Sequence, residues 1–187
     1  MKRSLLALLT LLSVSVVYAG NEDSSYIRVI TQRAGKIVAV LGLPDSSSFY
    51  RVRALVADQY FNLNAIYTQK DDVEGKVAKL HTAYLAKLGT VLNQEQVDKV
   101  KDGMTYSVLE VTYKGYQDEL PNLTDEQKAY ILTSLTEARE HAMDAESSEK
   151  KHAWFGKYKG RINNYLSAQG YDMKKAGEEW QKRLKGQ

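Results

Sequence analysis

Apolar residues recur at helical spacing along almost the whole of this 187-residue chain. Between residues 26 and 41 they lie three or four positions apart, which is the period of one helical face, and the same pattern returns over 49–66 and 73–88. The chain contains two prolines, and no linker rich in proline interrupts the pattern. The sequence therefore predicts a single all-α domain of six or seven helices.

Three later helix starts carry a capping side chain. Asn93 with Gln96, and Thr124 with Gln127, have the spacing of the reciprocal box, in which the cap and a glutamine three residues later satisfy free backbone N–H groups. Asp172 precedes the last helical pattern, which ends near residue 184. These signals predict helices that begin directly after the three caps.

The stretch GMTYSVLEVTYKGYQDELPN, residues 103–122, interrupts the helical pattern. It contains β-branched residues, two glycines, a proline and three tyrosines, and it has no clean apolar stripe. We interpret it as one long irregular loop. Such loops are uncommon inside a compact domain and are often functional where they occur.

The first 19 residues have the pattern of a secretory signal peptide. A basic start is followed by an apolar stretch that ends at Val17 and by the small-x-small sequence VYA. The apolar stretch is too short for a comfortable membrane span, and polar residues follow it at once. We therefore predict a signal peptide over 1–19 and an exported all-α domain over 20–187, periplasmic or secreted, with no membrane span after cleavage.

Composition excludes several kinds of site and partner. Without the two cations of residues 1–19, 24 Lys and Arg remain against 23 Asp and Glu, so the formal net charge falls from +3 to +1. A charge this small argues against a nucleic-acid partner. Because the chain has no cysteine, it has no disulfide, no thiolate zinc site and no thiol nucleophile.

The densest segment is HAWFGKYKGRINNYLSAQGYD, residues 152–172. Wound as a helix, most of its aromatic residues fall on one core-facing arc that includes Tyr158. A second stripe beside that arc consists of His152, Gly156, Lys159 and Asn163. A glycine inside a helix costs about 1 kcal/mol relative to alanine, so the two glycines of this helix suggest a close approach, either by another helix or by a ligand.

This stripe and the tyrosines of residues 103–122 have the side chains that commonly line a sugar-binding groove. Aromatic faces stack on sugar rings, and the cations favour an acidic sugar because they pair with carboxylates. The candidate catalytic residues are His152, Tyr158, Lys159 and Arg161, and the candidate binding residues are Gly156, Asn163, Asn164, Tyr106, Tyr113 and Tyr116. In a lyase-like scheme, His152 or Tyr158 transfers a proton. Lys159 or Arg161 then neutralises the carboxylate, and Asn163 orients the sugar.

Two acidic patterns resemble parts of a metal site. Glu137, His141 and Asp144 share a helical face, and Glu149 with His152 has the Glu-x-x-His spacing of helical-bundle metal centres. A dinuclear centre needs two such motifs and further carboxylates, so we interpret these residues as a solvated charged face and expect no metal and no other cofactor. His81 is interpreted as a packed or surface histidine.

Long, unusual strings in the chain carry a resemblance to a known family. The strings are KDGMTY, VTYKGY, LPNLT and KHAWFGKYKGRINNYLSAQGYD. Over roughly residues 24–182 the chain resembles an uncharacterised family of exported bacterial proteins, domain of unknown function 3826 (DUF3826). The resemblance implies a context of polysaccharide utilisation, particularly pectin breakdown, and it brings no established catalytic residue.

Together these observations predict an exported all-α protein that binds an acidic plant polysaccharide such as pectin, with or without lyase-like or hydrolase-like cleavage. Two alternatives belong to other classes. One is a periplasmic helical chaperone or stress protein. The other is a structural or partner-binding module, in which the glycines Gly156 and Gly160 lie at a helix crossing.

Overall fold

The computed structural model describes the backbone of residues 15–186 and the side chains from residue 24 onward. Over this range the chain forms eight helices and no strand: α1 (Ser15–Val38), α2 (Ser46–Gln69), α3 (Val73–Gly89), α4 (Gln94–Met104), α5 (Val108–Glu119), α6 (Asp125–Met143), α7 (Ser148–Ala168) and α8 (Met173–Lys185). The all-α prediction is confirmed. The predicted number of six or seven helices is too low.

The predicted signal peptide lies mostly outside the described residues, since residues 1–14 are not among them. From Ser15 onward, α1 continues without interruption past the predicted cleavage position at Gly20. Among the helices of residues 15–186, none combines the length and the apolar content that a membrane span requires.

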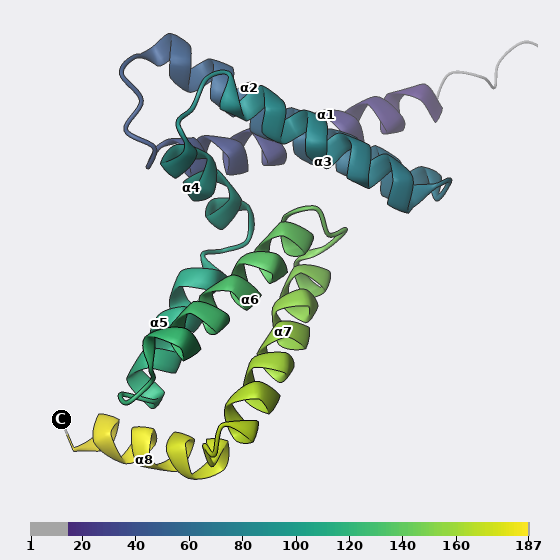
Figure 1. Cartoon of the computed structure of the whole chain (residues 1–187). Helices are drawn as coiled ribbons and strands as arrows, with labels where there is room; N and C mark the ends of the chain where they lie inside the picture. The colour runs from purple at the N-terminus through teal and green to yellow at the C-terminus, as the bar shows by residue number, and fades with distance from the viewer. Residues whose placement is uncertain (1–14, 187) are drawn as a thin grey trace, which may run out of the picture.

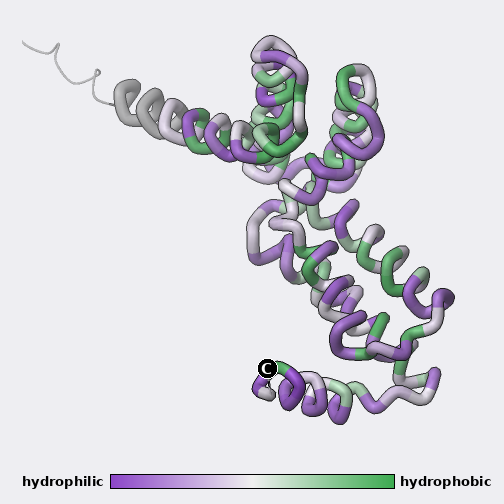
Figure 2. The backbone as a smooth tube through the Cα atoms, turned by 90° about the vertical axis from the view of Figure 1, so that its left-hand side faces the viewer, coloured by the Kyte–Doolittle hydropathy of each residue, from purple (hydrophilic) through white to green (hydrophobic). Residues whose placement is uncertain are grey.

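The helices form two halves, each around its own apolar core. Helices α1–α4 make the first half and α5–α8 the second, and the halves meet where α4 and the end of α6 lie together (Figure 1). The first core contains residues of α1–α4, and Met143 is its contribution from α6. The second core is built from α5–α8. Along the helices, hydrophobic and hydrophilic residues alternate every turn or half turn, as expected where each helix buries one face (Figure 2).

The prediction of a long irregular loop over 103–122 is wrong, because most of this stretch is α5. Tyr106 and Ser107 adopt positive φ angles of 60° and 54°, and this sharp break separates α5 from α4. After the break, Leu109, Tyr113 and Tyr116 recur at helical spacing and pack on the second core. The glycine and β-branched residues within this short helix hid its apolar stripe from pattern analysis.

Both predicted capping boxes are present. The Asn93 side chain accepts a hydrogen bond of 2.9 Å from the Gln96 backbone, and the Gln96 side chain accepts one of 3.1 Å in return. At α6, the corresponding distances between Thr124 and Gln127 are 3.2 and 2.9 Å. These caps fix where α4 and α6 begin, as the sequence predicted.

Charged side chains connect the two halves at α4 and α6. Arg139 of α6 is buried, and its guanidinium donates to Asp102 of α4 at 2.9 Å and to Asp98 of α4 at 2.6 Å. An arginine that binds two carboxylates through separate nitrogens is held in one orientation. It therefore sets the position of the C-terminal part of α6, beside which two cavities open.

Candidate functional site

The predicted stripe of α7 and two of the predicted tyrosines are in contact. The Tyr106 ring stacks on the His152 ring, with centroids 5.6 Å apart and planes 11° apart. The Tyr116 hydroxyl donates to the Asn163 side chain at 2.7 Å and to the Lys159 backbone carbonyl at 3.4 Å. Tyr106 and Tyr116 therefore lie against this face of α7; the sequence supplied these residue types but not their proximity.

Other predicted site residues lie elsewhere. Tyr158 is buried in the second core, as its place on the core-facing arc predicted, and the exposed Arg161 guanidinium covers its ring at 4.7 Å. Tyr113 is half-buried against the same core. Asn164 is exposed, and no contact joins it to the stripe within the described chain. Because Tyr158 is buried and its ring is covered by Arg161, it is unsuited to transfer a proton to a large ligand.

The two glycines of α7 do not lie at a helix crossing. A Cβ atom added at Gly156 or at Gly160 would meet no atom of a neighbouring element within 4 Å. The face of α7 at these positions is therefore open in the described structure, and the expectation of a tightly packed neighbouring helix is not met.

A cavity of about 470 Å³ lies between α1, α2 and the start of α7, and we call it the tyrosine cavity. Its lining includes four tyrosines and three cations, which are Tyr26, Tyr60, Tyr67, Tyr106, Arg33, Lys70 and Lys151. The Arg33 guanidinium lies 5.4 Å from the centroid of the Tyr60 ring. Burial raises the pKa of the Tyr60 hydroxyl to about 12, so this phenol stays neutral and can donate a hydrogen bond at physiological pH.

Lys151 lies in the wall of the tyrosine cavity and is itself buried. Its ammonium donates to the backbone carbonyls of Ala142 and Met143, at 3.0 and 2.7 Å, and so satisfies the C-terminal end of α6. Burial lowers the pKa of Lys151 to about 8; the nearby Asp144 carboxylate opposes this shift, and the cation Arg33 acts with burial. Two cations that oppose each other in one cavity favour a bound anion.

A second cavity of about 850 Å³ lies between α3, the end of α6 and the start of α7, and we call it the His81 cavity. His81 Nδ1 lies 2.5 Å from Asp144 Oδ2, and the other oxygen of Asp144 accepts a hydrogen bond of 3.0 Å from Gln59. The Asp144 carboxylate is buried. The hydrogen bond to Asp144 raises the pKa of His81, against the lowering effect of partial burial.

The two cavities adjoin and carry opposite charge. Both are lined by Tyr67 at the end of α2 and by Ala145 and Glu146 at the turn between α6 and α7. The remaining charged groups of the tyrosine cavity are cations, whereas the His81 cavity is lined by four carboxylates, which are Glu74, Glu140, Asp144 and Glu146, and by the single ammonium of Lys150.

The acidic pattern of α6 is not wholly a solvated face. Asp144 is buried, and the His141 ring stacks on Trp154 with centroids 4.4 Å apart. Glu137 is exposed, as expected. Within the part of the chain that the structure describes, no three His, Asp or Glu side chains converge as metal ligands do.

A comparison with protein families gives one match. The sequence profile of the family described as "protein of unknown function (DUF3826)" matches residues 27–78 and 68–186. The chain belongs to this family. The matched residues of this DUF3826 chain include the whole lining of the His81 cavity, and all of the tyrosine cavity except Tyr26. No curated protein matches the sequence.

Several residues of the two cavities were not predicted from the sequence of this DUF3826 chain. Arg33 and Tyr60 come from different helices, and no local pattern joins them. Lys151 did carry a signal, because it lies four residues before Phe155 on the arc that α7 buries. A lysine on a buried arc indicates a partnered or functional amine. His81 was expected to be packed or at the surface, and its partner Asp144 is 63 residues away in sequence.

Proposed function

We propose that the protein binds an acidic saccharide in the tyrosine cavity. The observation that carries this proposal is the combination of four tyrosines with Arg33, a cation that has no carboxylate partner among the described residues. An arginine fork matches a carboxylate in shape and charge, and tyrosines offer flat faces and a hydroxyl donor to a sugar ring.

The composition of the cavity favours a sugar acid over an inorganic anion. A small anion needs several converging donors, whereas this cavity is wide and aromatic and has the Asn64 amide in its lining for hydroxyl groups. Tyr106 lies at its rim and stacks on His152, so one predicted binding residue lines the cavity and a predicted catalytic residue lies beside it. A uronate-bearing oligosaccharide of the pectin type has the required carboxylate and ring faces, and the predicted export of the chain agrees with such a ligand.

Calorimetric titration of the chain without residues 1–19 tests this proposal. We expect saturable heat with oligogalacturonides and none with a neutral glucan oligosaccharide. Arg33→Ala removes a charge-assisted hydrogen bond, which contributes about 1.5–3 kcal/mol, so the affinity should fall by about 10- to 100-fold.

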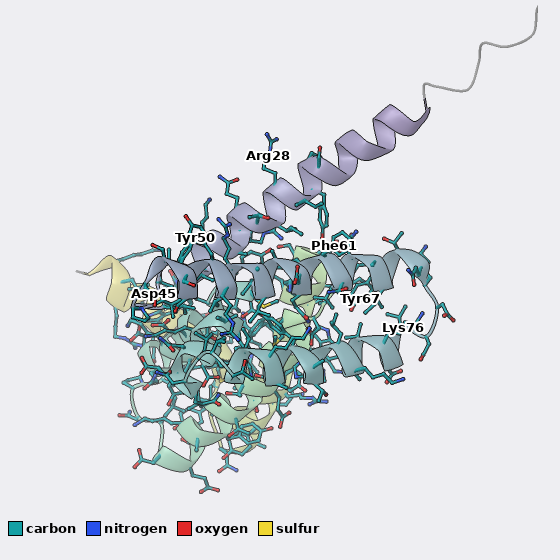
Figure 3. All side chains as sticks on the ribbon, turned by 90° about the horizontal axis from the view of Figure 1, so that it is seen from above. Arg28, Asp45, Tyr50, Phe61, Tyr67 and Lys76 are labelled. Atoms are coloured by element: carbon teal, nitrogen blue, oxygen red, sulfur yellow. The ribbon has the colours of Figure 1, made fainter. Side chains whose placement is uncertain are left out.

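The matched control is Arg28→Ala on the same helix. Arg28 is exposed and points away from the bundle (Figure 3), so its loss should leave the affinity unchanged. An absence of heat with the acidic ligand, or an equal loss in both variants, would contradict the proposal and favour the chaperone or partner-binding alternatives.

A further inference from the structure

The His81 cavity presents an imidazole that is held in one orientation. Asp144 binds Nδ1, and Asp144 is itself fixed by Gln59 and by burial of its carboxylate. A carboxylate on Nδ1 holds the proton there and leaves Nε2 for exchange of a proton with a ligand. This is the arrangement in which a buried aspartate orients a histidine for acid–base work.

Nε2 has no hydrogen-bond partner in the described chain. Glu140 Oε2 lies 3.8 Å from Nε2, which is beyond hydrogen-bond distance. The two Glu140 oxygens are already bound, one to Lys101 at 2.8 Å and the other to Arg139 at 3.4 Å. Since His81 lines the cavity, an oxygen atom of a ligand placed there can hydrogen-bond to Nε2.

The negative charge of the His81 cavity favours some reactions over others. Glu140 is paired with Lys101 and Arg139, but the lining still has a surplus of carboxylates over its single ammonium. This negative charge would destabilise a transition state that gains negative charge, such as that of ester hydrolysis or of proton abstraction beside a carboxylate. The same carboxylates stabilise a transition state that gains positive charge. Cleavage of a glycosidic bond has such an oxocarbenium-like transition state, and it needs a proton donor for the leaving oxygen.

The neighbouring tyrosine cavity indicates which glycoside fits. The cationic cavity suits an acidic sugar unit, whereas the carboxylates of the His81 cavity repel a second one. The two cavities share Tyr67, Ala145 and Glu146, so adjacent units of one chain can occupy them. The His81 cavity, at about 850 Å³, is within the range of about 300–1,000 Å³ that is usual for small-ligand sites.

We propose that His81 is the acid–base group of a glycoside-cleaving site, and that its substrate carries an uncharged sugar in the His81 cavity next to an acidic sugar in the tyrosine cavity. This proposal rests on the proposed function of the tyrosine cavity. Protonated Nε2 donates its proton to the glycosidic oxygen, the bond from that oxygen to the anomeric carbon breaks, and its electron pair stays on the leaving oxygen. Water adds through its oxygen to the anomeric carbon and gives up a proton to a cavity carboxylate and then to solvent, and Nε2 of His81 takes a proton back from solvent.

The experiment uses oligosaccharides that alternate galacturonate and rhamnose, with oligogalacturonides as the comparison. Products are measured by mass spectrometry in ¹⁸O-labelled water, and binding is measured separately by calorimetry. We expect cleavage of the alternating substrate, with one labelled oxygen in the new reducing end. Elimination would instead give an unsaturated, unlabelled sugar, and that result would overturn the proposed hydrolysis.

His81→Asn is the decisive variant, because the asparagine amide can replace Nδ1–H as the donor to Asp144 while Nε2 is lost. General acid–base groups typically contribute about 10²- to 10⁴-fold, so cleavage should fall by that factor with little change in Kd. His152→Asn tests the competing acid–base residue predicted on α7. The control is Glu137→Gln on α6, which should cleave at the wild-type rate because Glu137 is exposed and lines neither cavity.

The outcomes separate the two proposals. Binding of the alternating substrate without cleavage would overturn the role of His81 and leave the proposed function intact. Cleavage that survives in His81→Asn, or that is lost in His152→Asn alone, would also overturn it and would favour the acid–base residue first predicted on α7. An absence of binding would refute the proposed function, and with it the site that depends on it.

Discussion

Replacing both Gly156 and Gly160 with alanine should stabilise the protein. Both glycines are exposed inside α7, and the space that each new Cβ would enter is open to at least 4 Å from neighbouring elements. A glycine in a helix interior costs about 0.8–1.0 kcal/mol relative to alanine. The double variant should therefore gain about 2 kcal/mol in the free energy of unfolding.

Thermal and urea-induced unfolding, followed by circular dichroism, measure this gain. A chain of this length shifts its melting temperature by about 2–4 °C per kcal/mol, so we expect an increase of about 4–8 °C. The control is Gly103→Ala in α4, where the new Cβ would lie 2.9 Å from Ile37 Cγ2. That contact is too short, so the same substitution should destabilise the protein by about 1–3 kcal/mol.

A loss of stability in the α7 double variant would refute the reasoning, because it would mean that something packs against these glycines in solution. The same variant also tests the predicted binding role of Gly156. If a ligand approaches the backbone there, binding should weaken although stability rises. If the ligand lies in the tyrosine cavity alone, the affinity should not change.

Three further predictions concern caps and buried charges. Thr124→Ala removes one side of the α6 capping box and should lower the free energy of unfolding by about 1 kcal/mol, measured by urea denaturation. The pKa of His81 is raised above its ordinary 6.5, so the protonated histidine should stabilise the fold fully below pH 6.5, and this contribution should be lost as the pH rises through the folded-state pKa. Unfolding measured across pH 5–9 should show this fall in the free energy of unfolding in the wild type and not in His81→Asn. The pKa of Lys151, about 8, lies below its ordinary 10.5, so the buried charge should lower the free energy of unfolding fully below pH 8. The free energy of unfolding should therefore rise from pH 8 toward 10.5 in the wild type and not in Lys151→Met. An equal rise in both proteins would contradict the assignment.

Local signals predicted the local structure well. Each capping box needs only residues three positions apart, so Asn93 with Gln96 and Thr124 with Gln127 could be identified from the sequence. The helix α5 was missed because the break before it depends on positive φ angles at Tyr106 and Ser107, which neither residue type specifies. Because the break shifts the chain, the apolar residues before and after it do not lie on one continuous helical face.

The candidate site was predicted only in part, because it depends on tertiary packing. For Tyr106 and His152, composition supplied the residue types, and only the structure shows that the two rings stack. Arg33 and the His81–Asp144 pair join residues from different helices, and periodicity within one helix contains no information about such pairs. Lys151 is the exception, because a charged residue in register with a buried arc is visible in the sequence.

The division into two cores has a consequence for cooperativity. Met143 is the only residue of the second half that the first core includes among the described residues, and the other links across the junction are mainly hydrogen bonds and ion pairs. Each half should therefore open as its own cooperative unit, with separate protection of its amide protons against hydrogen exchange. Both cavities lie across this junction, so a bound ligand would contact both units at once. Ligand binding should then merge two opening events into one and raise protection in α3 and α7 together.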